Sequence, residues 1–149
     1  MLSQTVEYAL RAVVHLAFLA PESCKTSELA RVTQVPSAYL SKVVQSLARA
    51  GILSSQRGMG GGVSFAGDPK RITILDIVNV VDPIQRIKTC PLQLASHGKN
   101  LCPLHRRMDA ALAQVELAFG KTTLAEVLAD PSEVKPLCEV AGKLRKVRC

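Results

Sequence analysis

Four glycines in five positions, from Gly58 to Gly62, restrict the fold of this chain more than any other feature. Glycine adopts positive φ angles readily and has no side chain, so this run is expected to break regular structure in a tight turn. Residues 52–57 before it and 63–65 after it are short and β-prone. A nucleotide phosphate loop is not favoured, because no Gly-Lys-Ser/Thr follows and the run does not open a helix. We therefore predict a β-hairpin whose tip can approach another molecule closely.

Two helices are predicted at the start of the chain. Apolar residues at helical spacing mark the first from Thr5 to Ala20, and Pro21 ends it. The second is expected over Thr26–Val32, with Thr26 or Ser27 as its N-cap because a hydroxyl satisfies a free backbone N–H there. Both helices turn apolar residues inward and are expected to share one core.

A tight turn and a third helix follow. Residues 33–35 form the turn, Pro36 suits the opening of a helix because its missing N–H loses no bond there, and Gly51 ends the helix. Two short helices joined by a tight turn make a helix-turn-helix, and the hairpin adds a wing. The exposed positions on the third helix and the wing are the predicted DNA contacts: Ser37, Tyr39, Ser41, Lys42, Arg57, Gly58 and Gly60.

The second half of the chain is also predicted to be helical. Residues 73–76 have capping-box spacing and start a helix that ends at Asp82. A long alanine-rich helix is expected from Leu104 to Phe119 with Gly120 as its stop, and a short helix over residues 122–129. Because the amino-terminal core is nearly complete, we expect the apolar stripe of the long helix to pack against a second subunit.

These elements predict a mainly α fold with a small β-hairpin wing and a long dimerisation helix. Residues 1–82 would form the winged helix-turn-helix domain, 83–103 a cysteine-containing loop, 104–120 the dimerisation helix, and 121–149 a short helix and a basic tail. The longest apolar run, Ala9–Ala20, is too short to span a bilayer and is interrupted by Arg11 and His15. We therefore expect a cytoplasmic protein with no membrane partner.

Positive charge is concentrated on the predicted DNA reader. Residues 24–71 carry seven Lys and Arg against two Asp and Glu, whereas residues 81–142 carry seven of each. Residues 143–149 add four basic side chains and no acidic ones, which we interpret as a solvated tail. A basic patch attracts phosphate because binding releases counterions, although a solubilising surface would give the same total charge. The pattern favours double-stranded DNA as the partner, with no small-molecule substrate, and no motif positions a general base for an enzyme.

The five cysteines are an odd number in a chain expected to be cytoplasmic, which argues against a disulfide framework. Cys90, Cys102 and His105 lie within one short stretch. The two cysteines suit metal ligation, but they could also be buried thiols or a switchable dithiol, and His105 could simply cap a helix or face solvent. A metal-dependent enzyme, such as a zinc hydrolase on the same three residues, remains an alternative. The others, Cys24, Cys138 and Cys149, are interpreted as loop or tail thiols.

Several stretches resemble the Rrf-two (Rrf2) family of bacterial winged-helix regulators, which includes IscR, NsrR and RirA. The similar stretches are residues 8–12, 39–42, 47–53, 57–62, 74–78 and 90–105. The resemblance covers roughly the first 130 residues. It implies a homodimer that usually represses transcription and responds to oxidation, nitric oxide or cluster supply through an iron-sulfur cluster.

The resemblance also implies a ligand set, from which this chain departs. Cluster-bearing members commonly have three cysteines in this loop, and here the middle position falls on Ser96, a poor iron ligand. Arg11 stands where some relatives have a histidine ligand. His15, two turns beyond Glu7, is an alternative candidate ligand. The implied ligands of a [2Fe-2S] cluster are Cys90, Cys102 and His105 of one subunit and Glu7 of the other. Glu7 could instead serve only the helix dipole, and a cluster-free regulator controlled by a protein partner or thiol oxidation is the alternative.

Overall fold

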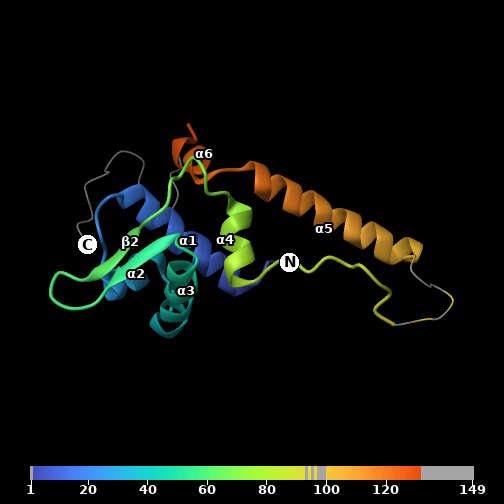
Figure 1. Cartoon of the computed structure of the whole chain (residues 1–149), viewed down its shortest axis with the longest axis horizontal. Coiled ribbons are helices and arrows are strands. Elements are labelled where there is room, and N and C mark those ends of the chain that lie inside the picture. The colour runs from blue at the N-terminus through green and yellow to red at the C-terminus, as the bar shows by residue number, and fades with distance from the viewer. Residues whose placement is uncertain (1, 93, 95, 97–99, 132–149) are drawn as a thin grey trace.

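A computed structural model describes residues 2–92, 94, 96 and 100–131 of the chain. Figure 1 shows a helical body with one long helix projecting from it. The elements in chain order are α1 (Gln4–Leu19), α2 (Thr26–Thr33), α3 (Ser37–Arg49), β1 (Leu53–Gln56), β2 (Gly62–Phe65), α4 (Ile74–Val81), α5 (Pro103–Lys121) and α6 (Leu124–Ala129). The predicted fold class, mainly helical with a small hairpin, is confirmed.

Helix α1 is the centre of the core. It packs against α2, α3, α4, α6 and β2. Its inward residues Val6, Ala9, Val13 and Leu16 are fully buried, and their spacing of three and four keeps them on one helical face. Ser3 caps the helix by accepting a hydrogen bond from the Val6 amide at 3.4 Å. The apolar spacing in the sequence therefore does mark the buried face.

The start of α2 differs from the prediction. Its N-cap is Lys25, which makes no side-chain cap bond, and neither Thr26 nor Ser27 serves as the cap. The reason is that Cys24 forms a two-way backbone bridge with Val63, at 2.8 Å in each direction, which keeps the chain extended up to Lys25. The helix therefore begins immediately after a strand contact that the local sequence does not reveal.

The turn, α3 and the hairpin complete the winged unit. Gln34 takes the left-handed conformation, with φ of 54°, between α2 and α3. The inward face of α3 is formed by Leu40, Val43, Val44 and Leu47. Strands β1 and β2 are antiparallel, with Leu53 opposite Phe65. Gly58 and Gly60 have φ of 102° and 77°, so the tip uses backbone conformations that glycine favours.

The carboxyl-terminal helices return to the same core. Thr73 and Asp76 form the predicted capping box of α4, and Thr123 and Glu126 form another at α6. Leu124 of α6 is fully buried in the core around α1. Helix α6 is held by a bridge between Thr73 and Thr123, so the short C-terminal helix belongs to the winged body.

Helix α5 extends away from this body and has no buried residue of its own. Gly120 is not its stop, because the helix continues to Lys121. A Cβ on Gly120 would lie 3.3 Å from Leu75 Cδ2, so glycine serves the close passage of α5 by α4. None of the helices in the described part of the chain is long and apolar enough to cross a membrane.

Candidate functional site

The first turns of α3 present polar groups to solvent. Ser37, Ser41 and Lys42 are exposed, while Leu40 between them is fully buried. The Ser41 hydroxyl donates to the Ser37 carbonyl at 3.0 Å and keeps its lone pairs available as acceptors. This arrangement leaves a polar helix start that a DNA groove can accommodate.

Tyr39 combines packing with exposure. Its ring meets the ring of buried Tyr8 edge to face, with 6.0 Å between centroids, yet 53% of the residue remains exposed. The Arg11 guanidinium lies 6.0 Å from the centre of the Tyr8 ring. Tyr39 is therefore braced by α1 while its outer surface remains available, which suits a contact residue that must hold one orientation.

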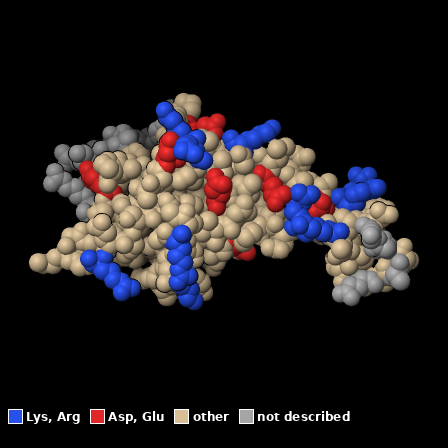
Figure 2. Space-filling model, viewed as in Figure 1, with Lys and Arg blue, Asp and Glu red and all other residues tan. Residues whose placement is uncertain are grey.

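The tip of the hairpin is exposed to solvent. Arg57 follows β1 directly and is exposed, and Met59 at the tip is fully exposed. A Cβ on Gly61 would lie 2.5 Å from the Gln56 carbonyl oxygen, so the turn requires glycine there. On the face shown in Figure 2, the lower edge formed by the hairpin and α3 carries Lys and Arg without an intervening acidic side chain. Its charge is complementary to a phosphate backbone.

The structure places Cys102 and His105 together at the amino-terminal end of α5. Cys102 is the N-cap and His105 lies in the first turn, with 3.2 Å between Sγ and Nδ1. Cys90 precedes them on the linker between α4 and α5, residues 82–102, and is buried. Among the residues that the structure describes, no three His, Cys, Asp or Glu side chains are arranged to hold a metal ion. The donor types suit a transition metal, and the side chains of Cys102 and His105 are in contact.

Glu7 lies in the first turn of α1 and pairs with Arg11. The Arg11 Nε donates to the Glu7 carboxylate at 2.9 Å, and the Glu7 side chain is 53% exposed. Arg11 also donates to the Thr33 carbonyl at 3.4 Å, which links α1 to the end of α2. Arg11 therefore has a structural role at the position where a histidine ligand was considered.

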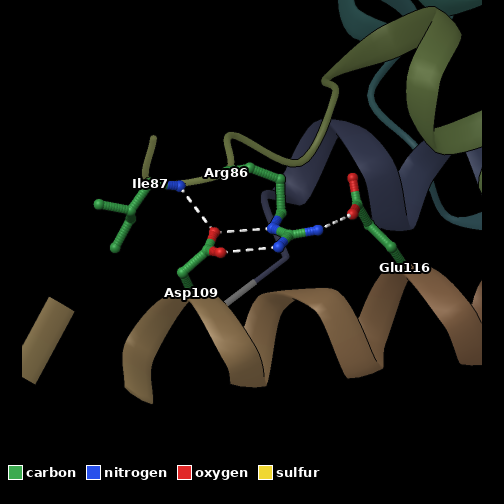
Figure 3. Close-up of polar contacts among 4 residues, drawn as sticks. All are labelled: Arg86, Ile87, Asp109 and Glu116. Atoms are coloured by element: carbon green, nitrogen blue, oxygen red, sulfur yellow. Dashed lines mark hydrogen bonds and ion pairs between the residues drawn. The ribbon is translucent and has the colours of Figure 1, made fainter. Parts of the chain in front are cut away.

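Sequence reasoning missed an ion-pair network between the linker and α5 (Figure 3). Arg86 donates to both oxygens of Asp109 at 2.7 Å and to Glu116 at 2.8 Å, and the Ile87 amide donates to Asp109 at 2.9 Å. Hydrogen bonding from Arg86 lowers the pKa of Asp109, and the two carboxylates raise the pKa of Arg86. The only sequence signal is that Asp109 and Glu116 are seven residues apart, hence on one helical face.

The remaining cysteines and histidines differ in their environments. Cys24 is not a loop thiol, because it is 1% exposed within the core and pairs with β2. His15 is buried on α1, its Nε2 has no hydrogen-bond partner, and burial lowers its pKa against the opposing effect of Glu28. Ser96 is exposed. His97, Cys138, Cys149 and the basic tail lie outside the described residues.

Sequence comparisons identify relatives over almost the whole described chain. The profile of the Rrf2 family, described as iron-dependent transcriptional regulators, matches residues 2–130. An HTH-type transcriptional regulator of Aquifex aeolicus is 31% identical over 129 residues, covering 85% of this chain and 90% of the relative. The regulator NsrR of Geobacillus kaustophilus is 28% identical over 142 residues, covering 91% and 95%.

Solved structures share the fold. IscR of T. potens superposes with a TM-score of 0.71 at 22% identity, covering 89% of each chain. CymR, the global cysteine regulator of B. subtilis, superposes with a TM-score of 0.68 at 23% identity, covering 85% of this chain and 95% of CymR. These likenesses confirm the predicted winged helix-turn-helix architecture with its long α5.

Proposed function

Because this chain belongs to the Rrf2 family of transcriptional regulators, we propose that it is a DNA-binding repressor whose operator affinity is controlled by a [2Fe-2S] cluster. The observation that carries the proposal is the contact between Cys102 Sγ and His105 Nδ1 at 3.2 Å, at the base of the helix proposed to form the dimer. A thiol and an imidazole at that separation suit adjacent ligands of one iron.

DNA binding is assigned to α3 and the hairpin. Ser37, Tyr39, Ser41 and Lys42 would enter the major groove, because they occupy the exposed start of α3. Arg57, Gly58 and Gly60 would meet the sugar-phosphate backbone, since the tip has little bulk. The basic edge formed by these elements supports both assignments.

A second copy of the chain would cover α5. Leu104, Met108, Val115 and Leu117 are exposed apolar residues on a helix that buries none of its own side chains in the described chain. Burying such residues between two copies would remove apolar surface from water. A two-fold axis through α5 would also place two copies of α3 on one operator.

The cluster would be held by Cys90, Cys102 and His105 of one subunit and by Glu7 of the other. When bound, a [2Fe-2S] cluster supplies a reversible one-electron change. The chain's own residues provide two thiols, an imidazole and an exposed carboxylate on the first turn of α1. For Glu7 to reach another subunit, it must exchange its pairing with Arg11, which lies on the surface and is therefore inexpensive to break.

The direct test is anaerobic purification followed by iron, sulfide and visible-absorption measurements. We expect iron and sulfide at about two per subunit, with absorption bands that change on reduction. Alanine at Cys90, Cys102 or His105, or glutamine at Glu7, should lower the iron content. Ser96→Ala is the matched control within the same segment and should retain it. Operator affinity that is equal in both redox states would contradict the proposed control.

A cluster-free regulator is the second candidate. It is favoured by the same contact, because a thiol beside an imidazole is a common arrangement in redox-active cysteine sites. It is also supported by the likeness to CymR, a cysteine regulator. A colourless, iron-free protein whose operator binding responds to thiol oxidation or to an added protein partner would favour this candidate.

A further inference from the structure

We propose that Arg86 is a positioning residue that fastens the linker after α4 onto α5 and thereby delivers Cys90 to the end of α5 that carries Cys102 and His105. The inference rests on the proposed function only for its consequence for the cluster. Three charged contacts and one backbone bond converge here, all within 2.9 Å. Among the described residues, the ion pairs that join the linker to α5 are those of Arg86 with Asp109 and Glu116.

The contacts of the Arg86 guanidinium fix both the position and the orientation of the linker on α5. Arg86 presents one edge to both oxygens of Asp109 and reaches Glu116, two helical turns along α5, with a third nitrogen. The Ile87 amide donates to the same Asp109 oxygen that accepts from Arg86 Nε, so the backbone beside Arg86 is held as well as its side chain. A planar guanidinium bonded in this way determines how far the linker lies along α5.

Arg86 and Asp109, the two partners of this contact, are close in sequence to Cys90 and His105. Cys90 is four residues beyond Arg86, so an extended chain carries it at most about 14 Å further. On α5, His105 is one turn before Asp109, about 6 Å along the helix axis. Fixing Arg86 on Asp109 therefore limits the positions that Cys90 can take relative to His105.

The contact is also partly shielded from solvent. The Arg86, Asp109 and Glu116 side chains are 32%, 20% and 29% exposed. Cys90 itself is 6% exposed, although residues 82–90 around it form neither helix nor strand. Helix α5 has no fully buried residue among those described, and Arg86 joins it through three short charged contacts. These charged contacts hold the linker at a defined point along α5.

Thiol trapping tests the proposal with or without a cluster. The full-length protein, cleared of metal with a chelator, is reacted with a maleimide, and labelling at each cysteine is followed by peptide mass spectrometry. Arg86→Gln should raise the labelling rate of Cys90 by roughly tenfold, which is the scale of losing a charge-assisted contact in a local opening equilibrium. Lys88→Gln removes a positive charge from an exposed position two residues away and should leave the rate unchanged.

Cys24 provides an internal standard for folding. It is buried in the core around α1, so it should stay protected in every variant if the change is local. Asp109→Asn keeps a carbonyl that can accept from the Ile87 amide but loses the bidentate ion pair, and it should also expose Cys90. Combining it with Arg86→Gln should add little, because both changes remove the same contact. Additive effects, or exposure of Cys24 together with Cys90, would overturn the assignment.

Cluster loading supplies a second measurement. If wild-type protein holds iron, Arg86→Gln should lose it faster than Lys88→Gln and show altered visible absorption. If wild-type protein holds no iron, the proposed cluster control fails, while the trapping experiment still decides whether Arg86 positions Cys90. Unchanged trapping in Arg86→Gln would overturn the inference whatever the iron content.

Discussion

The salt dependence of operator binding gives the sharpest test of the wing. Arg57 is exposed beside the hairpin tip, and within the described chain no acidic side chain pairs with it. If each Arg57 neutralises one phosphate, its binding releases about 0.9 counterion on B-form DNA. A dimer carries two copies, so Arg57→Ala should reduce the slope of log affinity against log salt by about 1.8.

This slope change predicts a specific pattern of affinity loss. Over a fourfold change in salt, from about 50 to 200 mM, a slope difference of 1.8 corresponds to about a twelvefold factor. The affinity ratio of wild type to Arg57→Ala should therefore be about twelve times larger at the lower salt concentration. Fluorescence anisotropy titrations with one operator duplex at four salt concentrations would measure it.

The control separates a wing contact from a change in net charge. Lys88→Ala removes the same charge from the linker, and its slope should match that of the wild type. Random-sequence DNA should show the same loss as the operator for Arg57→Ala, because a phosphate contact carries no sequence information. Equal slopes for wild type and Arg57→Ala would refute the docking of the wing on the backbone.

Three other substitutions test the core, the buried histidine and the dimer. A Cβ on Gly62 would lie 2.8 Å from the Cys24 carbonyl oxygen, so Gly62→Ala should break both bonds of the bridge to Val63 and lower the free energy of unfolding by about 2 kcal/mol in urea titrations. The control Ser64→Ala in the same strand should change the free energy of unfolding by less than about 0.5 kcal/mol. Burial lowers the pKa of His15 in the folded protein, so as the pH falls the His15 side chain is protonated more readily in the unfolded chain than in the folded one. The free energy of unfolding should therefore be constant above about pH 6.5 and decrease below it. His15→Leu should show a smaller decline between pH 7.5 and 5.5, and parallel stability curves would count against this assignment. Met108→Glu alters a half-exposed residue of α5 and should dissociate the dimer in sedimentation experiments while the monomer's unfolding midpoint stays the same.

Local patterns were sufficient to predict most of the winged body. The spacing of Val6, Val13 and Leu16, the capping box at Thr73 and the glycine-rich turn each act over a few residues, where covalent geometry and burial decide the conformation. The predictions that were wrong involve contacts between distant segments. The cap of α2 was displaced by the bridge between Cys24 and β2. Gly120 lies inside α5, where Leu75 of α4 passes close to it.

For the candidate site too, the sequence predicted the short-range contacts but not the long-range ones. The sequence placed Cys102 and His105 within one turn of a helix start, and their side chains do meet, because residues three apart share a helical face. It could not show that Arg86 joins Asp109 and Glu116, which are 23 and 30 residues away. It also could not show that Glu7 is paired with Arg11 while remaining exposed.

The sequence by itself determined that this chain forms a winged helix-turn-helix with a basic edge, since short-range hydrophobic spacing, turn chemistry and charge order are written along the chain. Only the tertiary structure decided where the linker lies, which cysteine is protected by the core, and which apolar residues of α5, such as Leu104 and Met108, stay exposed in the described part of the chain. The physical reason is that these features depend on which surfaces meet after the chain has folded, and a guanidinium or a thiol carries no local signal of its distant partner.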